Sequence, residues 1–142
     1  MPPAALPYAA ESRGTKARKE QFMPIIPSIM LKRLYVNGSL ENTDDGFHLA
    51  IRNTLAAGTI TGLGPVTVDG VEYDASAITV EMPGDQWPAI EITPDASLRF
   101  NMATTATIAI KAAPLPQGIH EIAITTDTRE AGRLVIQARD ST

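Results

Sequence analysis

Two histidines are the chain's only imidazoles, and they are the natural candidates for acid–base or metal chemistry. His48 follows the carboxylates Asp44 and Asp45, so these three residues are the candidate catalytic groups. His120 precedes Glu121 at the start of a predicted strand. Because both imidazoles stand in strand-like patterns without ligand spacing, we expect solvated strand residues rather than metal ligands or general bases.

Asp44 and Asp45 also resemble a fragment of an oxygen-rich calcium loop. The regular ligand spacing and the terminal glutamate of an EF-hand are missing, whereas short polar residues before Gly46 are typical of a turn. We therefore predict a turn here and no metal site. A hard cation at this place is the alternative, and an unchanged melting temperature with and without chelator would argue against it.

Trp87 is the only tryptophan and lies in the stretch PGDQWP, beside Asp85 and Gln86. A loop of this composition could offer an aromatic platform and polar groups to a ligand such as a sugar. The sequence provides no aromatic companion, so we expect the loop to cover the core instead. A carbohydrate- or cation-binding module remains an alternative, with these three residues as its ligand-binding candidates.

The sequence lacks the motifs of several classes of enzyme and cofactor-binding protein. The absence of cysteine excludes disulfides, thiolate catalysis and cysteine-based metal centres. No G-x-S-x-G elbow surrounds a serine, and the glycine-rich stretch GTITGLG lacks the lysine of a phosphate-binding loop. No cofactor is predicted.

Charge is distributed unevenly along the chain, whose formal net charge is -4. Residues 1–22 hold four basic against two acidic side chains, which gives +2 there and leaves -6 on residues 23–142. An acidic body argues against nucleic acid as the main partner. The start MPPAALPYAAESRG does not read as a secretory signal and no apolar run reaches membrane-spanning length, so we expect a soluble, cytoplasmic protein without a membrane partner.

Two parts of the chain are predicted from composition. Residues 1–22 read as a flexible tail, either functional or an extension from an upstream start codon, and residues 23–142 as a single domain. The apolar segment 23–31 is predicted to plug one open end of the sheet packing, with a subunit contact as the alternative. Pro27 can begin a short turn of helix within it.

Alternating apolar residues predict an all-β fold. The stretch 31–54 is predicted to be a hairpin of two strands around a polar turn at 41–46, and Asp69-Gly70 to form a tight type I′ turn. Strands are also expected at 56–65 with a bend, at 76–82, 89–92, 97–102 and 105–111, and in a final hairpin that turns at Gly132. About nine strands at ten-residue intervals predict an antiparallel β-sandwich, with a small barrel as the runner-up.

The runs LKRLYVNGSLENTDDGF, NTL, GLGPVTVDG and AGRLVIQARD resemble short prokaryotic all-β proteins, some of which are labelled hydroxymethylglutaryl-CoA reductase. The resemblance covers most residues after Met23. This sequence departs from that enzyme's pattern, since it has no dinucleotide-binding glycine motif and is far shorter. No active-site residue is carried over from the resemblance.

Three functional hypotheses follow. The first is a non-enzymatic binding or assembly module that forms a homo-oligomer or joins a partner protein through an edge strand or the segment 23–31. The second is a small enzyme, or an accessory subunit, that acts on a polar or CoA-linked metabolite with His48, Asp44 and Asp45 as acid–base groups. The third is the carbohydrate- or cation-binding module at Trp87.

Overall fold

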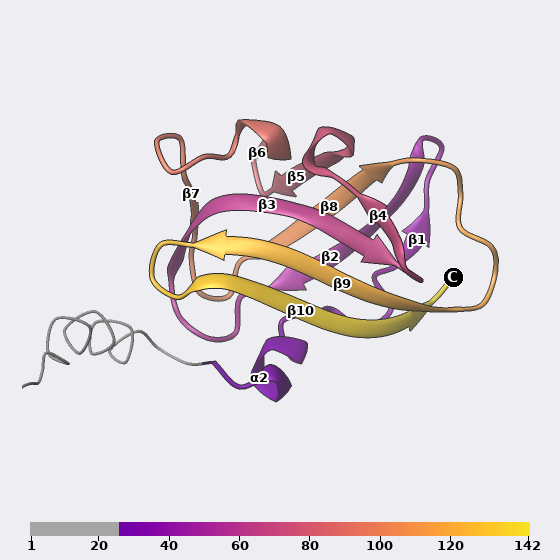
Figure 1. The fold of residues 1–142 in the computed structure, drawn as a ribbon, viewed down its shortest axis with the longest axis horizontal. Coiled ribbons are helices and arrows are strands. Elements are labelled where there is room, and N and C mark those ends of the chain that lie inside the picture. The colour runs from indigo at the N-terminus through magenta and orange to yellow at the C-terminus, as the bar shows by residue number, and fades with distance from the viewer. Residues whose placement is uncertain (1–25) are drawn as a thin grey trace, which may run out of the picture.

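Alternating apolar residues build ten strands in the part of the chain described by the computed structural model, residues 26–142 (Figure 1). The predicted tail at 1–22 and residues 23–25 lie outside the described residues. The elements are α2 (Ser28–Lys32), β1 (Glu41–Asn42), β2 (Gly46–Arg52), β3 (Gly58–Val68), β4 (Val71–Tyr73), η1 (Ala75–Ala77), β5 (Ile78–Met82), β6 (Asp85–Pro88), η2 (Ala89–Glu91), β7 (Leu98–Phe100), β8 (Thr105–Lys111), β9 (Ile119–Thr128) and β10 (Gly132–Ser141).

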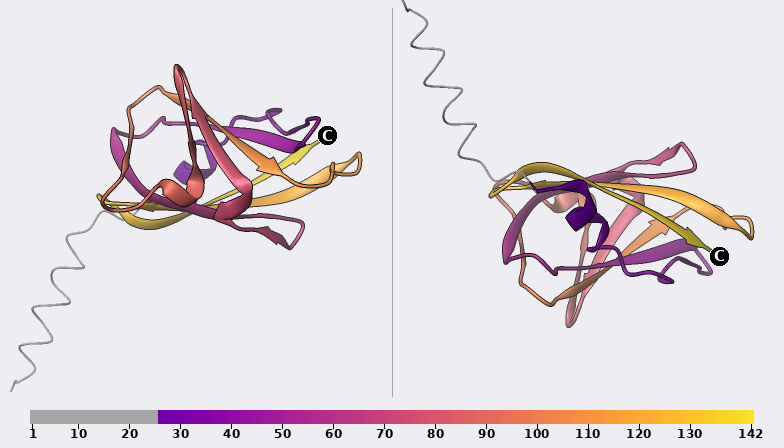
Figure 2. Two further views of the ribbon diagram at one scale, coloured as in Figure 1. Left: turned by 90° about the horizontal axis from the view of Figure 1, so that it is seen from above. Right: turned by 90° about the horizontal axis from the view of Figure 1, so that it is seen from below.

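The strands form two antiparallel sheets that face each other (Figures 1 and 2). One sheet has the order β1-β2-β8-β5-β6, and the other has the order β10-β9-β3-β4 with β7 paired to the start of β3. Since the strands divide into two open sheets, the predicted sandwich is confirmed and the small barrel is not. No helix among residues 26–142 is long and apolar enough to cross a membrane.

The core lies between the sheets and is mostly aliphatic. Every second residue of β2, β8 and β9 is buried, as a period of two requires. The large side chains with the least exposure are Leu40, Phe47, Leu49, Val66, Val68, Ile78, Ile108, Ile110, Ile124 and Ile136. Phe47 and Tyr73 add an edge-to-face aromatic pair with ring centroids 5.4 Å apart.

The predicted first strand, at residues 31–40, is wrong in part. The chain forms α2 and a turn there, and only an isolated bridge joins Tyr35 to Ile51. The strand β1 is instead Glu41–Asn42, two residues that the sequence pattern assigned to the turn. The alternation at 34–40 correctly indicated β2 as the neighbour of this segment, because the backbone of Leu34 and Val36 bonds to β2. A continuous strand does not form, because Gly38 has a φ of 83° and breaks it.

The segment 34–40 closes one side of the sandwich by bonding to both sheets. On the first sheet, Leu34 O accepts from Arg52 N at 2.7 Å and Val36 N donates to Ala50 O at 3.0 Å. On the second, the Asp140 carboxylate of β10 accepts from Tyr35 Oη at 2.6 Å and from two backbone N–H groups of this segment. Backbone groups that a buried loop would leave unpaired therefore find partners.

Two tight turns hold the β3–β4 and β5–β6 hairpins. Asp69 and Gly70, with φ of 52° and 83°, join Val68 to Val71 and confirm the predicted turn. Pro83 and Gly84 join Met82 to Asp85, so PGDQWP is a hairpin and not the loop expected from its Pro and Gly content.

Three further strand predictions meet different outcomes. The bend predicted near Ile60 and Leu63 is confirmed as two register shifts against β9. The strand predicted at 89–92 is wrong, because residues 89–91 form a 3-10 turn that buries Ala89 and exposes Ile90. The strand predicted at 97–102 is shorter than expected, since β7 ends at Phe100 and Met102 is exposed.

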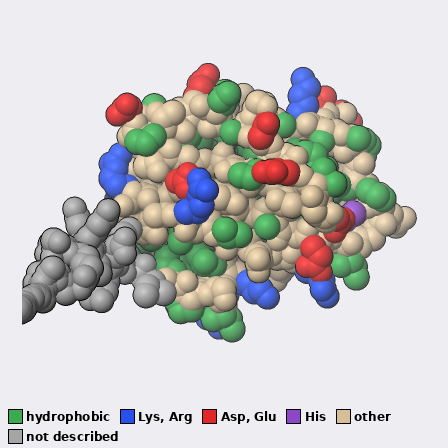
Figure 3. Space-filling model, in the orientation of Figure 1, with side chains coloured by type: hydrophobic (Ala, Val, Ile, Leu, Met, Phe, Trp, Pro, Cys, Tyr) green, Lys and Arg blue, Asp and Glu red, His purple; other side chains and the backbone are tan. Residues whose placement is uncertain are grey.

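The helix α2 begins directly after Pro27, as predicted, and lies beside β10 on the side away from β9 (Figures 1 and 2). It buries Leu31 and leaves Ile29 and Met30 exposed by 62% and 39%. A helix in this position covers part of the free edge of the longest edge strand. Figure 3 shows hydrophobic side chains gathered at the lower edge of the molecule, around this helix.

Candidate binding sites

His48 meets a different carboxylate from the ones that the sequence suggested. Its Nε2 lies 3.6 Å from Oε1 of Glu41, its cross-strand neighbour on β1. Its Nδ1 is buried and has no hydrogen-bond partner among the described residues. Glu41 was missed as a neighbour because the pattern placed it in the turn and not in the strand that pairs with β2.

Asp44 and Asp45 lie in the exposed turn between β1 and β2. The turn is closed by backbone bonds, with Thr43 N donating to Gly46 O at 2.8 Å and Ala112 N donating to Asp45 O at 3.1 Å. Among residues 26–142 no group of three or more His, Asp or Glu side chains is placed to hold a metal ion. The three residues of the acid–base hypothesis are therefore not joined by any hydrogen bond or ion pair that the structure records.

The residues of the carbohydrate hypothesis lie on β6. Trp87 is half-buried, pairs with Val80 of β5 and packs against the core, as the expectation of a cover predicts. Asp85 and Gln86 are exposed, and Oδ1 of Asp85 accepts from the backbone N–H of Gln86 at 2.8 Å. The three side chains follow one another along a strand, so Trp87 and Asp85 share one face and Gln86 points to the other.

His120 is buried, with 4% exposure, so the expectation of a solvated histidine is wrong. Its Nδ1 lies 2.6 Å from Oδ2 of Asp69 and its Nε2 lies 2.7 Å from the backbone oxygen of Pro116. Since a carboxylate and a carbonyl can only accept, both ring nitrogens carry protons and the ring is an imidazolium. It has no free lone pair for a metal or a substrate proton.

The electrostatics of this pair follow from the same contacts. The hydrogen bond to Asp69, followed by that to Pro116 O, raises the pKa of His120, while burial opposes the rise. In return, the bond from His120 lowers the pKa of Asp69, and the backbone N–H of Glu121 adds to the effect. The pair ties the β3–β4 turn to the start of β9, and the bond to Pro116 O ties in the chain before β9, which is a structural role.

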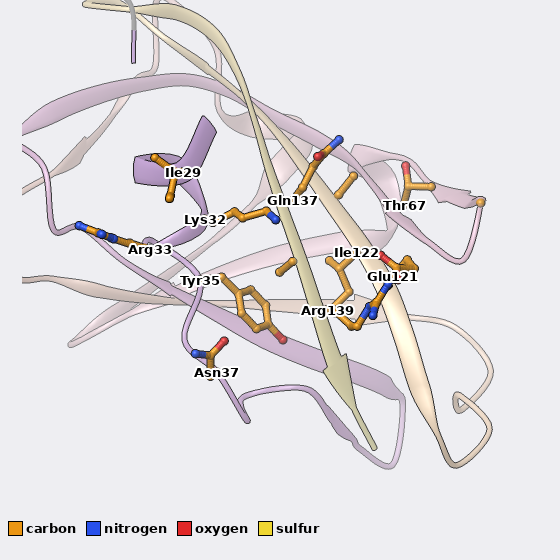
Figure 4. A pocket seen from close by; sticks show the side chains of 13 residues that line it. Ile29, Lys32, Arg33, Tyr35, Asn37, Thr67, Glu121, Ile122, Gln137 and Arg139 are labelled. Atoms are coloured by element: carbon orange, nitrogen blue, oxygen red, sulfur yellow. Dashed lines mark hydrogen bonds and ion pairs between the residues drawn. The ribbon is translucent and has the colours of Figure 1, made fainter. Parts of the chain in front are cut away.

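A broad groove runs along β10 (Figure 4). Lys32 and Tyr35 come from α2 and the segment after it, and Gln137, Thr67 and Arg139 from the sheet, while Arg33 points away from β10. The volume is about 1060 Å³ and the groove is open to solvent. Two of its polar side chains already have partners, because Arg139 binds Glu121 with Nε 2.6 Å from Oε2 and Tyr35 binds Asp140.

A second hollow is smaller and apolar, and it opens at the end of the sandwich beside α2. Its volume is about 370 Å³. It lies where β2 ends and β3 begins, and β9, β10 and α2 complete it. We call it the end pocket, and its apolar lining comprises Ile26, Pro27, Met30, Leu34, Ile51, Leu55, Ala56, Ala57, Ile60, Phe100, Ala131, Leu134 and Ile136.

Asn53 holds the loop that forms one wall of the end pocket. Its Nδ2 donates to Ala56 O at 2.8 Å and to Phe100 O at 2.9 Å, and its Oδ1 accepts from Leu55 N at 3.1 Å. With 5% exposure, this amide is a buried polar group whose bonds are satisfied. These bonds fix the wall of the end pocket, and they engage the amide of Asn53 with the backbone rather than with a ligand.

Glu130 fixes a neighbouring part of the rim, at the start of β3. Its carboxylate accepts from the backbone N–H and the hydroxyl of Thr59, both at 2.8 Å, so that the β9–β10 turn is bound to the start of β3. These bonds, that from the backbone N–H first, lower the pKa of Glu130. Two polar anchors therefore fix the walls of a hollow whose lining is mostly apolar and also includes Thr59, Thr126 and Thr128.

Sequence reasoning did not find the end pocket. Its lining comes from four separate stretches of chain, which are 26–34, 51–60, Phe100 and 126–136, and each apolar residue reads locally as core. The one available signal was the polar residue Asn53 directly after the apolar face of β2, since asparagine at a strand end commonly bonds the local backbone.

Fold and site together define a two-sheet antiparallel β-sandwich with an apolar pocket at one end. Residues 30–142 match the family described as hydroxymethylglutaryl-CoA reductase, N-terminal domain, and the chain belongs to this family. The resemblance to proteins that carry this label is thus confirmed. No curated protein matches the chain.

Proposed function

We propose that this protein is a non-enzymatic binding module, and that the end pocket is where it receives an apolar group. The observation that carries the proposal is a hollow of about 370 Å³ with an almost entirely apolar lining that opens to the surface. This volume is within the range of about 300–1,000 Å³ that ligand pockets occupy. Filling it would remove apolar surface from water, which is the main source of affinity for such sites.

The anchoring of the pocket walls supports the same proposal. Asn53 bonds to the backbone oxygens of Ala56 and Phe100, and Glu130 bonds to the backbone N–H of Thr59, so these walls of the hollow are fixed before anything binds. A preformed site does not need to be ordered at the moment of binding, which saves free energy. The exposed side chain of Met30 on α2 extends the apolar surface to the rim, and methionine adapts readily to different shapes.

The test is a fluorescence titration of the full chain with N-phenyl-1-naphthylamine, an uncharged apolar probe that brightens when it leaves water. We expect saturable binding at one site. Leu55→Trp, which adds bulk at the pocket wall, should weaken probe binding at least about tenfold, a change of about 1.4 kcal/mol.

Ile90→Trp is the matched control, because it adds the same ring at an exposed position outside the pocket. Its probe affinity should equal that of the unchanged chain. Absence of saturable binding, or equal binding by the two tryptophan variants, would contradict the proposal.

A second candidate is an accessory subunit that handles a CoA-linked metabolite. The family description supports it, and so does the groove along β10, where Lys32 and Arg139 contribute positive charge. Coenzyme A should then raise the melting temperature, since a ligand that binds only the folded state stabilises it. The double variant Lys32→Ser/Arg139→Ser should lose the rise, and an unshifted melting temperature at millimolar coenzyme A would remove this candidate.

A further inference from the structure

The side-chain hydrogen-bond donors that line the end pocket already have partners within the protein. In the described part of the chain these donors belong to Asn53, Thr59, Thr126 and Thr128. The hydroxyls of the two β9 threonines donate to backbone oxygens at 3.1 and 2.9 Å, and the amide of Asn53 and the hydroxyl of Thr59 make the bonds described above. A ligand that brought a carboxylate into this lining would meet no side chain ready to donate to it, and an anion that loses water without gaining a donor is strongly disfavoured.

Among residues 26–142, Glu130 is the one charged side chain that lines the end pocket, and it is exposed at the β9–β10 turn. Each of its oxygens accepts one bond from Thr59, and a carboxylate oxygen can accept two, so both oxygens keep a lone pair for a ligand. The backbone N–H and then the hydroxyl of Thr59 lower the pKa of Glu130, so this group is negative at neutral pH.

The arginines nearest to this carboxylate are directed to other partners. The guanidinium of Arg129 donates to a backbone oxygen and a hydroxyl in the loop before β7, at 3.1 and 3.3 Å, and Nε of Arg99 donates to Oδ1 of Asn101 at 3.2 Å. The described residues include no ion pair of either arginine with Glu130. The charge on the lining of the pocket is therefore negative, in keeping with the formal -6 of residues 26–142.

We propose that Glu130 sets the charge specificity of the end pocket, so that the pocket accepts a hydrocarbon chain that ends in an amine and rejects the same chain ending in a carboxylate. The inference rests on the proposed function and names the class of its ligand, a small cationic amphiphile. The hydrocarbon fills the apolar hollow, and the ammonium group lies at the rim and donates to the oxygens of Glu130.

The test measures displacement of N-phenyl-1-naphthylamine from the full chain by octylamine and by octanoate at neutral pH, where the two carry opposite charges. Octanol has the same chain and no charge, so each affinity is taken relative to that of octanol and changes in pocket shape cancel. We expect octylamine to displace the probe at a concentration about fivefold or more below that of octanoate, because a carboxylate attracts one and repels the other. Added salt should reduce this difference.

Glu130→Gln removes the charge and keeps an oxygen for the backbone N–H of Thr59. In this variant octylamine and octanoate should displace the probe at concentrations within about twofold of each other. Glu72→Gln is the matched control, because it makes the same change at an exposed position of β4 outside the end pocket. It should keep the preference for octylamine.

The outcomes separate this inference from the proposed function. Equal displacement by octylamine and octanoate, a preference that survives in Glu130→Gln, or its equal loss in Glu72→Gln would overturn the role of Glu130 and leave the binding module standing. Absence of saturable probe binding by the unchanged chain would overturn the proposed function itself. The comparison of the two ligands on the unchanged chain needs no variant, so it decides the matter even if Glu130→Gln does not fold.

Discussion

At the scale of single residues, the buried imidazolium of His120 makes stability depend on pH. Its pKa is raised in the folded state, so its contribution is complete below the unfolded value near 6.5 and is lost as pH rises through the folded value. The pKa of Asp69 is lowered in the folded state, so the stability that Asp69 contributes is present above its unfolded pKa of about 3.8. This contribution is lost as the pH falls through the pKa of folded Asp69. The pair stabilises most between these limits.

We therefore expect His120→Gln to cost about 1–3 kcal/mol near pH 5.5, because it leaves Asp69 or Pro116 O without a donor. The cost should shrink as the pH rises through the raised pKa of His120 in the folded state, because the native ring then loses its charge. Urea denaturation at a series of pH values from about 5.5 upward measures it. His48→Gln is the control and should cost under about 1 kcal/mol, since His48 makes one contact of 3.6 Å with Glu41.

A second residue-scale prediction concerns Asp140. Burial would raise its pKa, yet the bonds from Tyr35, Ser141, Leu40 and Gly38 lower it, so these bonds outweigh the desolvation. Asp140→Asn keeps the shape but removes the charge, and we expect a loss of about 1.5–3 kcal/mol in the free energy of unfolding.

Asp127→Asn provides the comparison for Asp140 in the same denaturation experiment. Asp127 pairs with Arg133 on the exposed face of β9 and β10, where an ion pair contributes under about 1 kcal/mol. If the two variants lost equal stability, the role assigned to Asp140 would be wrong.

None of these residue contacts could be read from the sequence. His120 and Asp69 are 51 positions apart, and Tyr35 and Asp140 are 105 apart. Alternation predicts which side of a strand a residue occupies, but it does not predict which turn will fold over that side. His120 was expected to be a solvated strand residue because it stands at the start of a strand without ligand spacing, whereas the structure places it on the buried face and its neighbour Glu121 on the exposed one.

At the scale of elements, the junction between the first turn and β2 depends on Gly46. A Cβ at this position would lie 2.0 Å from the backbone oxygen of Ile110 and 2.7 Å from Ala112 N. Both are backbone atoms of a central strand and its end, so neither can move aside. We expect Gly46→Ala to cost about 3 kcal/mol or more, measured as a lowered urea midpoint.

Gly58→Ala is the control for this effect. The nearest atom to its Cβ would be Oε1 of Glu130 at 3.6 Å, which is an ordinary contact. It should change stability by under about 1 kcal/mol. A similar loss in both variants would mean that close packing at Gly46 is not the cause.

Elements with a strong local pattern were predictable, and those set by distant contacts were not. Asp69-Gly70 fixes its hairpin with two residues, and β8 and β9 alternate cleanly. Residues 34–40 also alternate, but bonds to Asp140 hold them as a bridge between sheets. At 89–91, Pro88 and the burial of Ala89 override the alternation of Ile90 and Ile92.

At the scale of the whole molecule, the free strand edges differ in length. The edge strands β1, β4 and β6 have two, three and four residues, whereas β10 has ten. Long unpaired edges invite association with another chain, and α2 lies beside this one. The docked helix therefore protects the sandwich from pairing edge to edge.

We expect Leu31→Ala to loosen α2 and to increase self-association, because it removes the buried side chain of the helix. Sedimentation velocity over a range of protein concentrations measures the change. Ile29→Ala, on the exposed side of the same helix, should leave the sedimentation profile unchanged. Equal self-association of both variants would show that α2 does not protect the edge of β10.

The bond between Tyr35 and Asp140 also carries a consequence for the order of events during translation. Its two ends are 105 positions apart, so the segment 34–40 emerges from the ribosome long before the carboxylate that holds it. Until β10 is made, β2 lacks its bridge to the second sheet and the apolar faces of the early strands stay open. A nascent chain paused before β10 should therefore be a good client for chaperones that recognise exposed apolar strands.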